Sequence, residues 1–353
     1  MSGVRPRQAR HEVNILGTRH DFVDLTKPAQ SPAKRAMSAQ VVVVGSFVQD
    51  LTWKCADFPR AGETVLGNFI TGPGGKGSNQ AVAAGRAGAR TLFIGAVGDD
   101  SFGANAKKFY EAEGIAARFV VKPAHPTGTA AILVDTKGQN EIIVALGANS
   151  ALRPEDIPVD VLRNAKVVLT QHETDLRTVA TVLRTARRAR VVTVHNPAPM
   201  RNDFAPALLR HVDVLIPNET EFAELINRFA GQTAATHSRF LSAFSVGGLP
   251  QDMLHALCRT LEVPTIIVTL GAKGVFVSEP GGYVFIAAHK VKVVDTTGAG
   301  DAFCGGFAAG LVKFPGDILA AARFGNAVAA LSVTKFGTAP AMPTQREIAR
   351  FLS

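Results

Sequence analysis

Continuous apolar runs alternate with amphipathic segments of helical length along most of this chain. The first run, Val41–Val44, is four consecutive valines, which is typical of a strand buried on both faces of a parallel sheet. Further strands are predicted at Thr91–Val97, Val167–Thr170, Val191–Val194, Val212–Ile216, Thr265–Leu270 and Val275–Ser278. Helices are predicted at Ser78–Ala87, Ser101–Glu113, Leu176–Arg188, Glu219–Arg228, Gln251–Leu261, Gly300–Val312 and Asp317–Thr334. This alternation predicts an α/β fold with a doubly wound, mainly parallel sheet flanked by helices.

Two regions, 51–73 and 128–146, interrupt the alternation because they are predicted as consecutive strands without helices. In the second region, Gly128–Val134 and Glu141–Leu146 flank the polar stretch Thr136–Gln139, which indicates a β-hairpin. A few strands inserted in an α/β chain predict a small β-sheet lid. The polar segment 231–250 is expected to be a surface loop.

Residues 1–38 have no sustained hydrophobic period and are expected to form a disordered extension. They hold seven basic and three acidic residues and so contribute +4 to the net charge of +9. Met37 lies directly before the first predicted strand and is an alternative start. Residues 39–353 are expected to form one domain that carries the lid strands.

The rest of the positive charge is spread thinly, without the basic stripe and aromatic platform of a nucleic-acid-binding protein. A mildly basic surface suits an anionic small molecule instead. Cys55, Cys258 and Cys304 are far apart and match no metal-binding spacing, which favours a reducing compartment and a cytoplasmic location. No apolar stretch is long enough to span a membrane and the amino terminus lacks a signal-peptide core, so no membrane association is expected.

The motif Asp295-Thr-Thr-Gly-Ala-Gly-Asp301 has the strongest chemical content. A strand predicted at Lys290–Val294 leads into a glycine turn and then a helix, so the amides of Ala299, Gly300 and Asp301 are expected to form an anion site. An aspartate there can accept the proton of an attacking hydroxyl, as phosphoryl transfer requires. A simple helix cap is the structural alternative. Two aspartates around two glycines, Gly298 and Gly300, favour the functional interpretation.

The second motif is Gly74-Gly-Lys-Gly-Ser-Asn79. Glycine amides, the Lys76 ammonium and the Asn79 amide can all bond to sugar hydroxyls, although a flexible glycine loop would have the same composition. Gly72–Gly77 also matches the GxGxxG pattern of dinucleotide-binding proteins, but it contains Pro73 and follows the lid region. A dehydrogenase is therefore an alternative that rests on this match alone.

Three more sites are candidates. Asn218 and Glu221 have the spacing of a capping box, which is the structural interpretation, or they hold water around Mg²⁺. Asp50 follows the first strand and can bind paired sugar hydroxyls. Thr269–Gly274 follows a strand end, where ligands of open α/β sheets bind. An ordinary turn is the structural alternative both for Asp50 and for this loop.

Together these motifs resemble the ribokinase (PfkB) family of sugar kinases, from about Gln40 to the carboxyl terminus. Further stretches that carry the resemblance are Gly62-Glu-Thr64, Gly147-Ala-Asn149, Asn196-Pro-Ala-Pro199 and Pro217-Asn-Glu-Thr220. The resemblance implies transfer of the ATP γ-phosphoryl group to O5 of D-ribose, with Asp301 as the base. The Gly298–Gly300 turn is then the anion hole.

The resemblance also implies the binding residues. The sugar contacts would be Val48, Gln49, Asp50, Gly74, Gly75, Lys76, Gly77, Ser78, Asn79, Glu173 and Asp301. The ATP contacts would be Asn218, Thr269, Leu270, Gly271, Ala272, Lys273, Gly274, Gly300, Asp301 and Asn326. An activating K⁺ ion would be held, largely through backbone carbonyls, by Asp295, Thr297, Ser332, Lys335, Gly337 and Ala341. Mg²⁺ would be held through water by Asn218 and Glu221.

The family's lid strands often pair two subunits, so a homodimer is expected. Val48, His172 and Ala341 depart from the family pattern, where Asn, an apolar residue and Ser are common. Other sugars (fructose, 2-keto-3-deoxygluconate, deoxyribose) and nucleosides remain alternative substrates; Trp53, Phe58 and Phe69 are candidates for a base pocket. A non-catalytic sugar-binding regulator is a further alternative, although such a protein would be free to lose Asp301.

Overall fold

The structure is a computed structural model that describes residues 39–229 and 246–353. The disordered extension expected at 1–38 and most of the loop expected at 231–250 lie outside the described residues. Short 3-10 turns aside, the helices are α2 (Lys76–Arg86), α3 (Ser101–Glu113), α4 (Val159–Asn164), α5 (Leu176–Arg188), α6 (Glu219–Phe229), α8 (Gln251–Arg259), α9 (Ala299–Lys313), α10 (Ile318–Ser332) and α11 (Gln345–Leu352).

A main sheet runs in the order β13-β12-β11-β10-β9-β8-β1-β4-β5. Its strands are β1 (Val41–Val44), β4 (Thr91–Val97), β5 (Ala116–Val121), β8 (Val167–Thr170), β9 (Val192–His195), β10 (Val214–Leu215), β11 (Thr265–Thr269), β12 (Gly274–Glu279) and β13 (Gly282–Ala287). From β5 to β11 neighbouring strands are parallel, and β12 pairs antiparallel with both of its neighbours. The predicted doubly wound α/β fold is confirmed.

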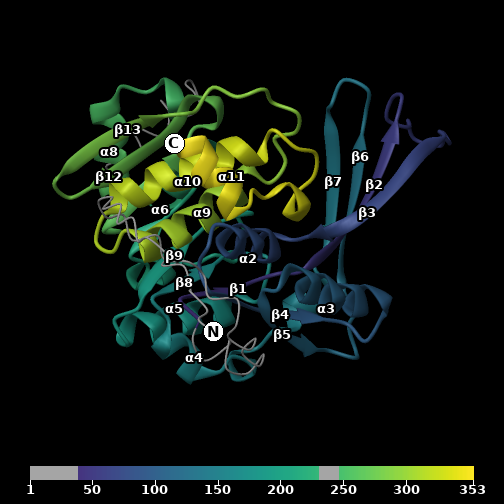
Figure 1. Cartoon of the computed structure of the whole chain (residues 1–353), viewed down its shortest axis with the longest axis horizontal. Helices are drawn as coiled ribbons and strands as arrows, with labels where there is room; N and C mark the ends of the chain where they lie inside the picture. Colours follow the sequence, from purple (N-terminus) through teal and green to yellow (C-terminus); the bar gives the residue numbers. More distant parts are fainter. Residues whose placement is uncertain (1–38, 230–245) are drawn as a thin grey trace, which may run out of the picture. The chain divides into compact units, whose positions relative to one another are not determined.

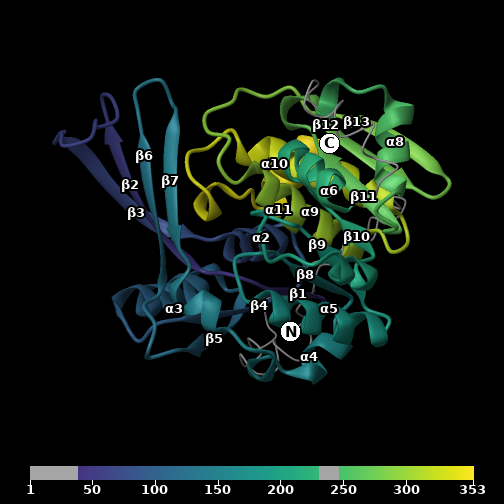
Figure 2. The same cartoon turned by 180° about the vertical axis from the view of Figure 1, so that it is seen from behind.

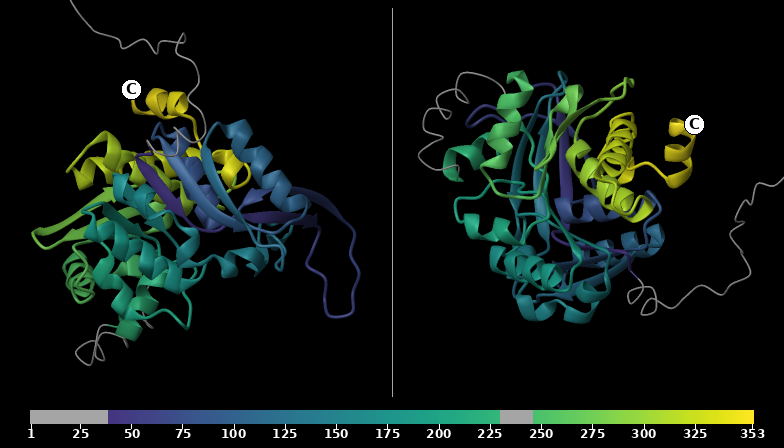
Figure 3. Two further views of the ribbon diagram at one scale, coloured as in Figure 1. Left: turned by 90° about the horizontal axis from the view of Figure 1, so that it is seen from below. Right: turned by 90° about the vertical axis from the view of Figure 1, so that its left-hand side faces the viewer.

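Helices cover both faces of this sheet (Figures 1 and 3). The four valines of β1 divide between two cores because successive side chains of a strand point to opposite faces. Val41 and Val43 pack in a core with buried residues of α2, α9 and α10. Val42 and Val44 pack in a core with residues of α4 and α5. A strand buried on both faces explains the unbroken apolar run.

A second sheet has the order β3-β2-β6-β7. Its strands are β2 (Val48–Cys55), β3 (Gly67–Gly74), β6 (Gly128–Val134) and β7 (Asn140–Ala145). Figure 2 shows its strands extending beside the main sheet. The predicted second sheet and the hairpin at Thr136–Gln139 are confirmed, and Gly138 supplies the positive φ of 78° that the turn uses.

The strand predicted at Lys290–Val294 is wrong, because this segment is irregular. The amides of Val294 and Asp295 both donate to one carbonyl, that of Val333 at the end of α10, at 2.8 and 3.2 Å. Two bonds to a single acceptor cannot form a strand ladder. The two edge strands of the main sheet, β5 and β13, were not predicted. Within the described ranges, none of the helices has the length and apolar character that crossing a membrane requires.

Candidate active site

The two glycine-rich motifs meet where α2 and α9 begin, beside the carboxyl ends of parallel strands. α2 starts at Lys76, directly after Gly75, whose φ of 89° strains any residue with a side chain. Gly77 lies so close to the preceding chain that a Cβ atom would come within 2.5 Å of the Ser46 nitrogen. The glycines of this motif are therefore needed to bring the start of α2 against β1.

Asp301 lies in the first turn of α9 and is only 7% exposed. Asn79 Nδ2 donates to Asp301 Oδ2 at 2.9 Å, and Gln80 Nε2 donates to Asp301 Oδ1 at 2.9 Å. Each carboxylate oxygen keeps a second lone pair, so the group can still accept a proton from a bound hydroxyl. The base predicted from the sequence is thus buried and held by two neutral amides.

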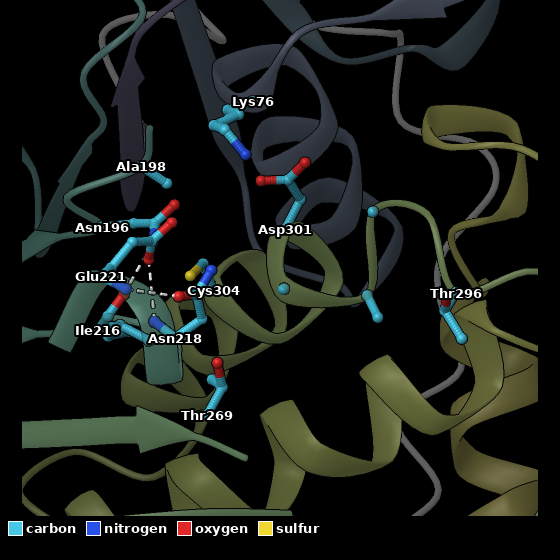
Figure 4. Close-up of a pocket in the computed structure, with 13 residues that line it drawn as sticks. Lys76, Asn196, Ala198, Ile216, Asn218, Glu221, Thr269, Thr296, Asp301 and Cys304 are labelled. Carbon is cyan, nitrogen blue, oxygen red and sulfur yellow. Dashed lines mark hydrogen bonds between the residues drawn. The ribbon is translucent and has the colours of Figure 1, made fainter. Parts of the chain in front are cut away.

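Lys76 brings a positive charge to this carboxylate, and Figure 4 shows its ammonium group pointing toward Asp301. Burial alone lowers the pKa of Lys76, but the carboxylates of Asp301, Glu173 and Glu221 outweigh that effect, so the pKa is raised. Lys76 is therefore a cation at neutral pH. It suits an anionic group placed between α2 and α9.

A pocket of about 180 Å³ opens beside Asp301 (Figure 4). It is lined by Lys76, Asn196, Ala198, Ile216, Asn218, Glu221, Thr269, Thr296, Gly298, Ala299, Gly300, Asp301 and Cys304. Its members come from the ends of β9, β10 and β11 and from the first turns of α2, α6 and α9. Ligands of open α/β sheets bind at this edge.

The anion site differs in one detail from the prediction of three free amides. Gly298 adopts a left-handed φ of 77° before α9. The amide of Ala299 donates to the Thr296 carbonyl at 3.2 Å, so it is already engaged. The amides of Gly300 and Asp301 remain in the first helical turn, where no carbonyl four residues earlier belongs to the helix. The predicted anion site is consequently reduced to two amides from α9, together with Lys76.

Among the residues predicted to bind sugar, Glu173 is held by two donors. Its Oε2 atom accepts from Ser46 Oγ at 2.5 Å and from the backbone amide of Lys76 at 2.9 Å. Asp50 lies in β2 and accepts at Oδ2 from Thr338 Oγ1 at 3.3 Å. Burial, helped by the charges of Glu173 and Asp301 and opposed by the Thr338 hydrogen bond, raises the pKa of Asp50 to about 7.

Other residues of the predicted sugar site have different partners. Gln49 donates to Thr71 Oγ1 at 2.7 Å, and strand alternation places it on the face of β2 opposite Asp50. Ser78 is fully buried and accepts from Tyr110 at 3.2 Å. Val48 is buried, and Gly74 lies directly against the Asp50 carboxylate. The contacts of Gln49 and Ser78 with sugar stay predictions that these hydrogen bonds do not support.

Asn218 and Glu221 form the capping box that the spacing predicted. Asn218 Oδ1 accepts from the Glu221 amide at 2.8 Å, and Glu221 Oε2 accepts from the Asn218 amide at 2.9 Å. Burial raises the pKa of Glu221, opposed by the Asn218 amide and the Lys76 charge. Both residues also line the pocket, so capping and ligand binding are compatible.

Of the loop Thr269–Gly274, only Thr269 lines this pocket. Its amide donates to the Pro217 carbonyl at 3.0 Å, which joins the end of β11 to the start of α6. Lys273 Nζ donates to the Gly247 carbonyl at 3.1 Å, and Asn326 Nδ2 donates to the Ala287 carbonyl at 2.7 Å. Leu270 is buried, whereas Gly271 and Ala272 are exposed.

Some of the residues predicted to hold a monovalent cation are hydrogen-bonded to one another. Asp295 Oδ1 accepts from the Thr297 amide at 2.9 Å, and Asp295 Oδ2 accepts from the Gly337 amide at 3.0 Å. The Ser332 carbonyl accepts from the Lys335 amide at 3.2 Å. Ala341 is buried. Among the described residues, no group of three or more His, Cys, Asp or Glu side chains is placed to hold a metal ion.

Sequence reasoning missed Gln80, Gln171, Asn196 and Thr338. Gln80 is the neighbour of a predicted ligand, but adjacent helix positions point about 100° apart, so no periodicity places both on Asp301. Gln171 and Asn196 follow strand ends, which is the one signal that would have marked them. Thr338 is brought to Asp50 from 288 positions away.

The chain matches the model of the pfkB family carbohydrate kinases over residues 38–345. It is 37% identical over 320 residues to the ribokinase of Haemophilus influenzae, with 90% of this chain and 99% of the relative covered. It is 34% identical to the deoxyribokinase of Salmonella typhi, with 89% and 98% covered. The structure of Arabidopsis thaliana ribokinase complexed with ribose and ATP matches with a TM-score of 0.74 and 29% identity, covering 90% of this chain and 99% of that one. The chain therefore belongs to the pfkB family of carbohydrate kinases.

Proposed function

We propose that this protein is an ATP-dependent kinase that phosphorylates D-ribose at O5. The observation that carries the proposal is the buried Asp301 carboxylate, held by Asn79 and Gln80 at the start of α9. A helix start with free amides suits a phosphoryl group. Relatives named ribokinase and a similar structure named as a complex with ribose and ATP support the choice of substrates.

Asp301 accepts the proton of the ribose 5-hydroxyl as O5 attacks the γ-phosphorus of ATP. The bond from that phosphorus to the bridging oxygen breaks, and ADP leaves with its electron pair. The amides of Gly300 and Asp301 and the ammonium of Lys76 stabilise the negative charge on the transferred group. Asp301 is part of both the base and the anion site because its carboxylate and its amide belong to the same helical turn.

The sugar hydroxyls are bound by acceptors that the protein already holds in place. Asp50 and Glu173 provide carboxylates. Asn79 Oδ1 is buried and has no hydrogen-bond partner in the protein, which is costly unless a ligand donates to it. A sugar hydroxyl satisfies this atom. Asn79 then contacts both the sugar and the base.

Two ions complete the proposed chemistry. Mg²⁺ would neutralise the ATP phosphates, and Asn218 and Glu221, which line the pocket, would hold its water ligands. K⁺ would be held by Asp295 and by backbone carbonyls of Thr297, Ser332, Lys335 and Gly337. Asp295 fits this role because it already joins the 295–297 turn to Gly337. Ala341 contributes no side-chain oxygen.

We propose a homodimer formed by the outer face of the second sheet. The side chains of Trp53, Phe69 and Ile143 are 37%, 51% and 76% exposed. The rings of Trp53 and Phe69 pack together, with their centroids 5.1 Å apart. Exposed apolar side chains gathered on one sheet face suit a partner surface. An Ile143→Asp variant that stays dimeric in analytical ultracentrifugation would contradict this.

The proposed cytoplasmic location agrees with the three free cysteines and is testable by cell fractionation.

The test is a substrate panel with purified protein, Mg²⁺, K⁺ and ATP. D-Ribose should give ribose 5-phosphate, and 5-deoxyribose, which lacks O5, should give no product. Deoxyribose is the second candidate because a deoxyribokinase is among the relatives. Fructose, 2-keto-3-deoxygluconate and adenosine complete the panel. A preference of kcat/KM for any of these over ribose would contradict the proposed substrate.

A further inference from the structure

The Gln80 side chain lies between the catalytic carboxylate and two polar residues at the ends of neighbouring strands. Gln80 is fully buried, and its Nε2 atom donates to Asp301 Oδ1 at 2.9 Å and to Asn196 Oδ1 at 3.1 Å. Its Oε1 atom accepts from Gln171 Nε2 at 2.5 Å. We propose that Gln80 is a positioning residue that sets the orientation of the Asp301 carboxylate, and that Gln171 and Asn196 fix Gln80 in turn.

The orientations of the Asn196 and Gln80 amides are determined by their neighbours. Asn196 Nδ2 donates to the Ile216 carbonyl at 2.7 Å, so Asn196 Oδ1 must face Gln80. Asn196 Oδ1 and Asp301 Oδ1 are both acceptors, so the Gln80 amide can present only its nitrogen to them, and its oxygen then faces the Gln171 donor. A reversed Gln80 amide would place two donors together on one side and two acceptors together on the other.

The hydrogen-bond network is attached to the ends of three neighbouring strands. Gln171 follows β8, Asn196 follows β9 and Ile216 follows β10, and these three strands are neighbours in the parallel sheet. Gly45 permits the close packing of Gln171, because a Cβ atom at Gly45 would come within 2.1 Å of Gln171 Oε1. Gln80 therefore connects these strand ends, through hydrogen bonds, to Asp301 in the first turn of α9.

The role of Gln80 follows from the way in which the two carboxylate oxygens of Asp301 are held. Asn79 holds Oδ2 and Gln80 holds Oδ1, so rotation of the carboxylate is resisted at both oxygens. Hydrogen bonds to an ionised acceptor are stronger than neutral ones. Without Gln80, only Asn79 would hold the carboxylate, and Oδ1 could turn toward the Lys76 ammonium and away from the sugar hydroxyl. Misplacing a reacting group by about 1 Å costs on the order of a hundredfold in rate.

This inference rests on the proposed sugar kinase activity, so wild-type turnover on the substrate panel is measured first. Gln80→Met keeps the length of the side chain and removes the donor. We expect kcat to fall by about 10- to 100-fold, with KM for ribose changed by less than about threefold. Circular dichroism and thermal unfolding establish whether the variant is folded.

The deciding experiment is a double-mutant cycle with Asp301→Ala, measured with radiolabelled ATP. If Gln80 acts through Asp301, Gln80→Met should lower the residual turnover of Asp301→Ala by less than about twofold. An equal loss in both backgrounds means a general structural role and overturns the inference, as does a Gln80→Met enzyme with normal kcat. If Gln80→Met does not fold, the same cycle with Gln171→Met decides, and additivity there overturns the inference. A wild-type protein that phosphorylates no sugar refutes the proposed function itself, and the inference with it.

Discussion

Asn79 and Asp301 are separated by 222 positions in the chain, yet Asn79 Nδ2 donates to Asp301 Oδ2 at 2.9 Å. This bond joins the two motifs that the sequence marked independently, one for sugar binding and one for proton transfer. The other end of the same amide, Asn79 Oδ1, is buried without a partner. One side chain thus holds the Asp301 carboxylate with its nitrogen and leaves its oxygen available to a ligand.

Replacement of Asn79 should therefore affect both binding and turnover. In Asn79→Ala, the base loses a donor and the sugar loses an acceptor, and each bond is worth roughly 1–3 kcal/mol. We expect kcat to fall and KM for ribose to rise, each by about tenfold or more. Steady-state kinetics with saturating ATP measure both. An Asn79→Ala enzyme with unchanged KM would show that this oxygen does not bind the sugar.

Asp50 should make sugar capture depend on pH near neutrality. Its pKa is raised to about 7, so the carboxyl is neutral below this pH and ionised above it. The ionised form is the stronger acceptor for sugar hydroxyls. We expect kcat/KM for ribose to rise with pH through about 7. This acid limb should be lost in Asp50→Asn.

Thr338→Val provides a matched test of the same carboxyl. The Thr338 hydroxyl stabilises the ionised form of Asp50, so its removal should move the acid limb to higher pH. A limb that persists unchanged in Asp50→Asn would assign it to another group.

The stability of the protein should fall in mild acid because of a buried histidine pair. His172 and His195 are fully buried, and their Nε2 atoms lie 2.9 Å apart. Burial lowers the pKa of His172 to about 4, and burial together with His172 lowers the pKa of His195 well below its ordinary value. Below pH 6.5 the unfolded chain therefore binds more protons than the folded one.

The contribution of the neutral histidine pair to the free energy of unfolding is therefore fully present well above pH 6.5, and it decreases as the pH falls from 6.5 toward 4. Between pH 7.5 and pH 5.0, His172 alone should lower the free energy of unfolding by about 2 kcal/mol. Urea denaturation at the two pH values measures this. His172→Gln should show a smaller difference between them, and a difference as large as that of the wild type would contradict the assignment.

Potassium should activate the enzyme without contacting either substrate. Asp295 already ties the turn before the anion site to Gly337, and a bound cation would fix that turn further. Turnover should be higher in K⁺ than in Na⁺ or in cation-free buffer. Equal rates in all three buffers would contradict the prediction. Ala341→Ser, which adds a side-chain oxygen, should lower the K⁺ concentration needed for half-maximal activation.

The sequence predicted those features that depend on local pattern. The β1 valines, the lid hairpin and the Asn218–Glu221 capping box follow from periodicity and spacing alone. The segment Lys290–Val294 has the composition of a strand, but it is irregular, and the amide of Val294 bonds to Val333 at the end of α10. The Gln80 contacts also arise only when α2, α9 and the strand ends come together, so no local signal predicts them.

The central claim is that Asp301 removes the proton from the ribose 5-hydroxyl. The most direct measurement is kcat of Asp301→Asn with D-ribose, ATP, Mg²⁺ and K⁺, beside Asp317→Asn as the matched control. Asp317 caps α10, because its Oδ1 atom accepts from the Ala320 amide at 2.8 Å. An asparagine can cap a helix equally well, so this control variant should keep its activity. We predict that Asp301→Asn loses at least about a hundredfold in kcat while remaining folded. An Asp301→Asn enzyme with near-normal kcat would contradict the claim.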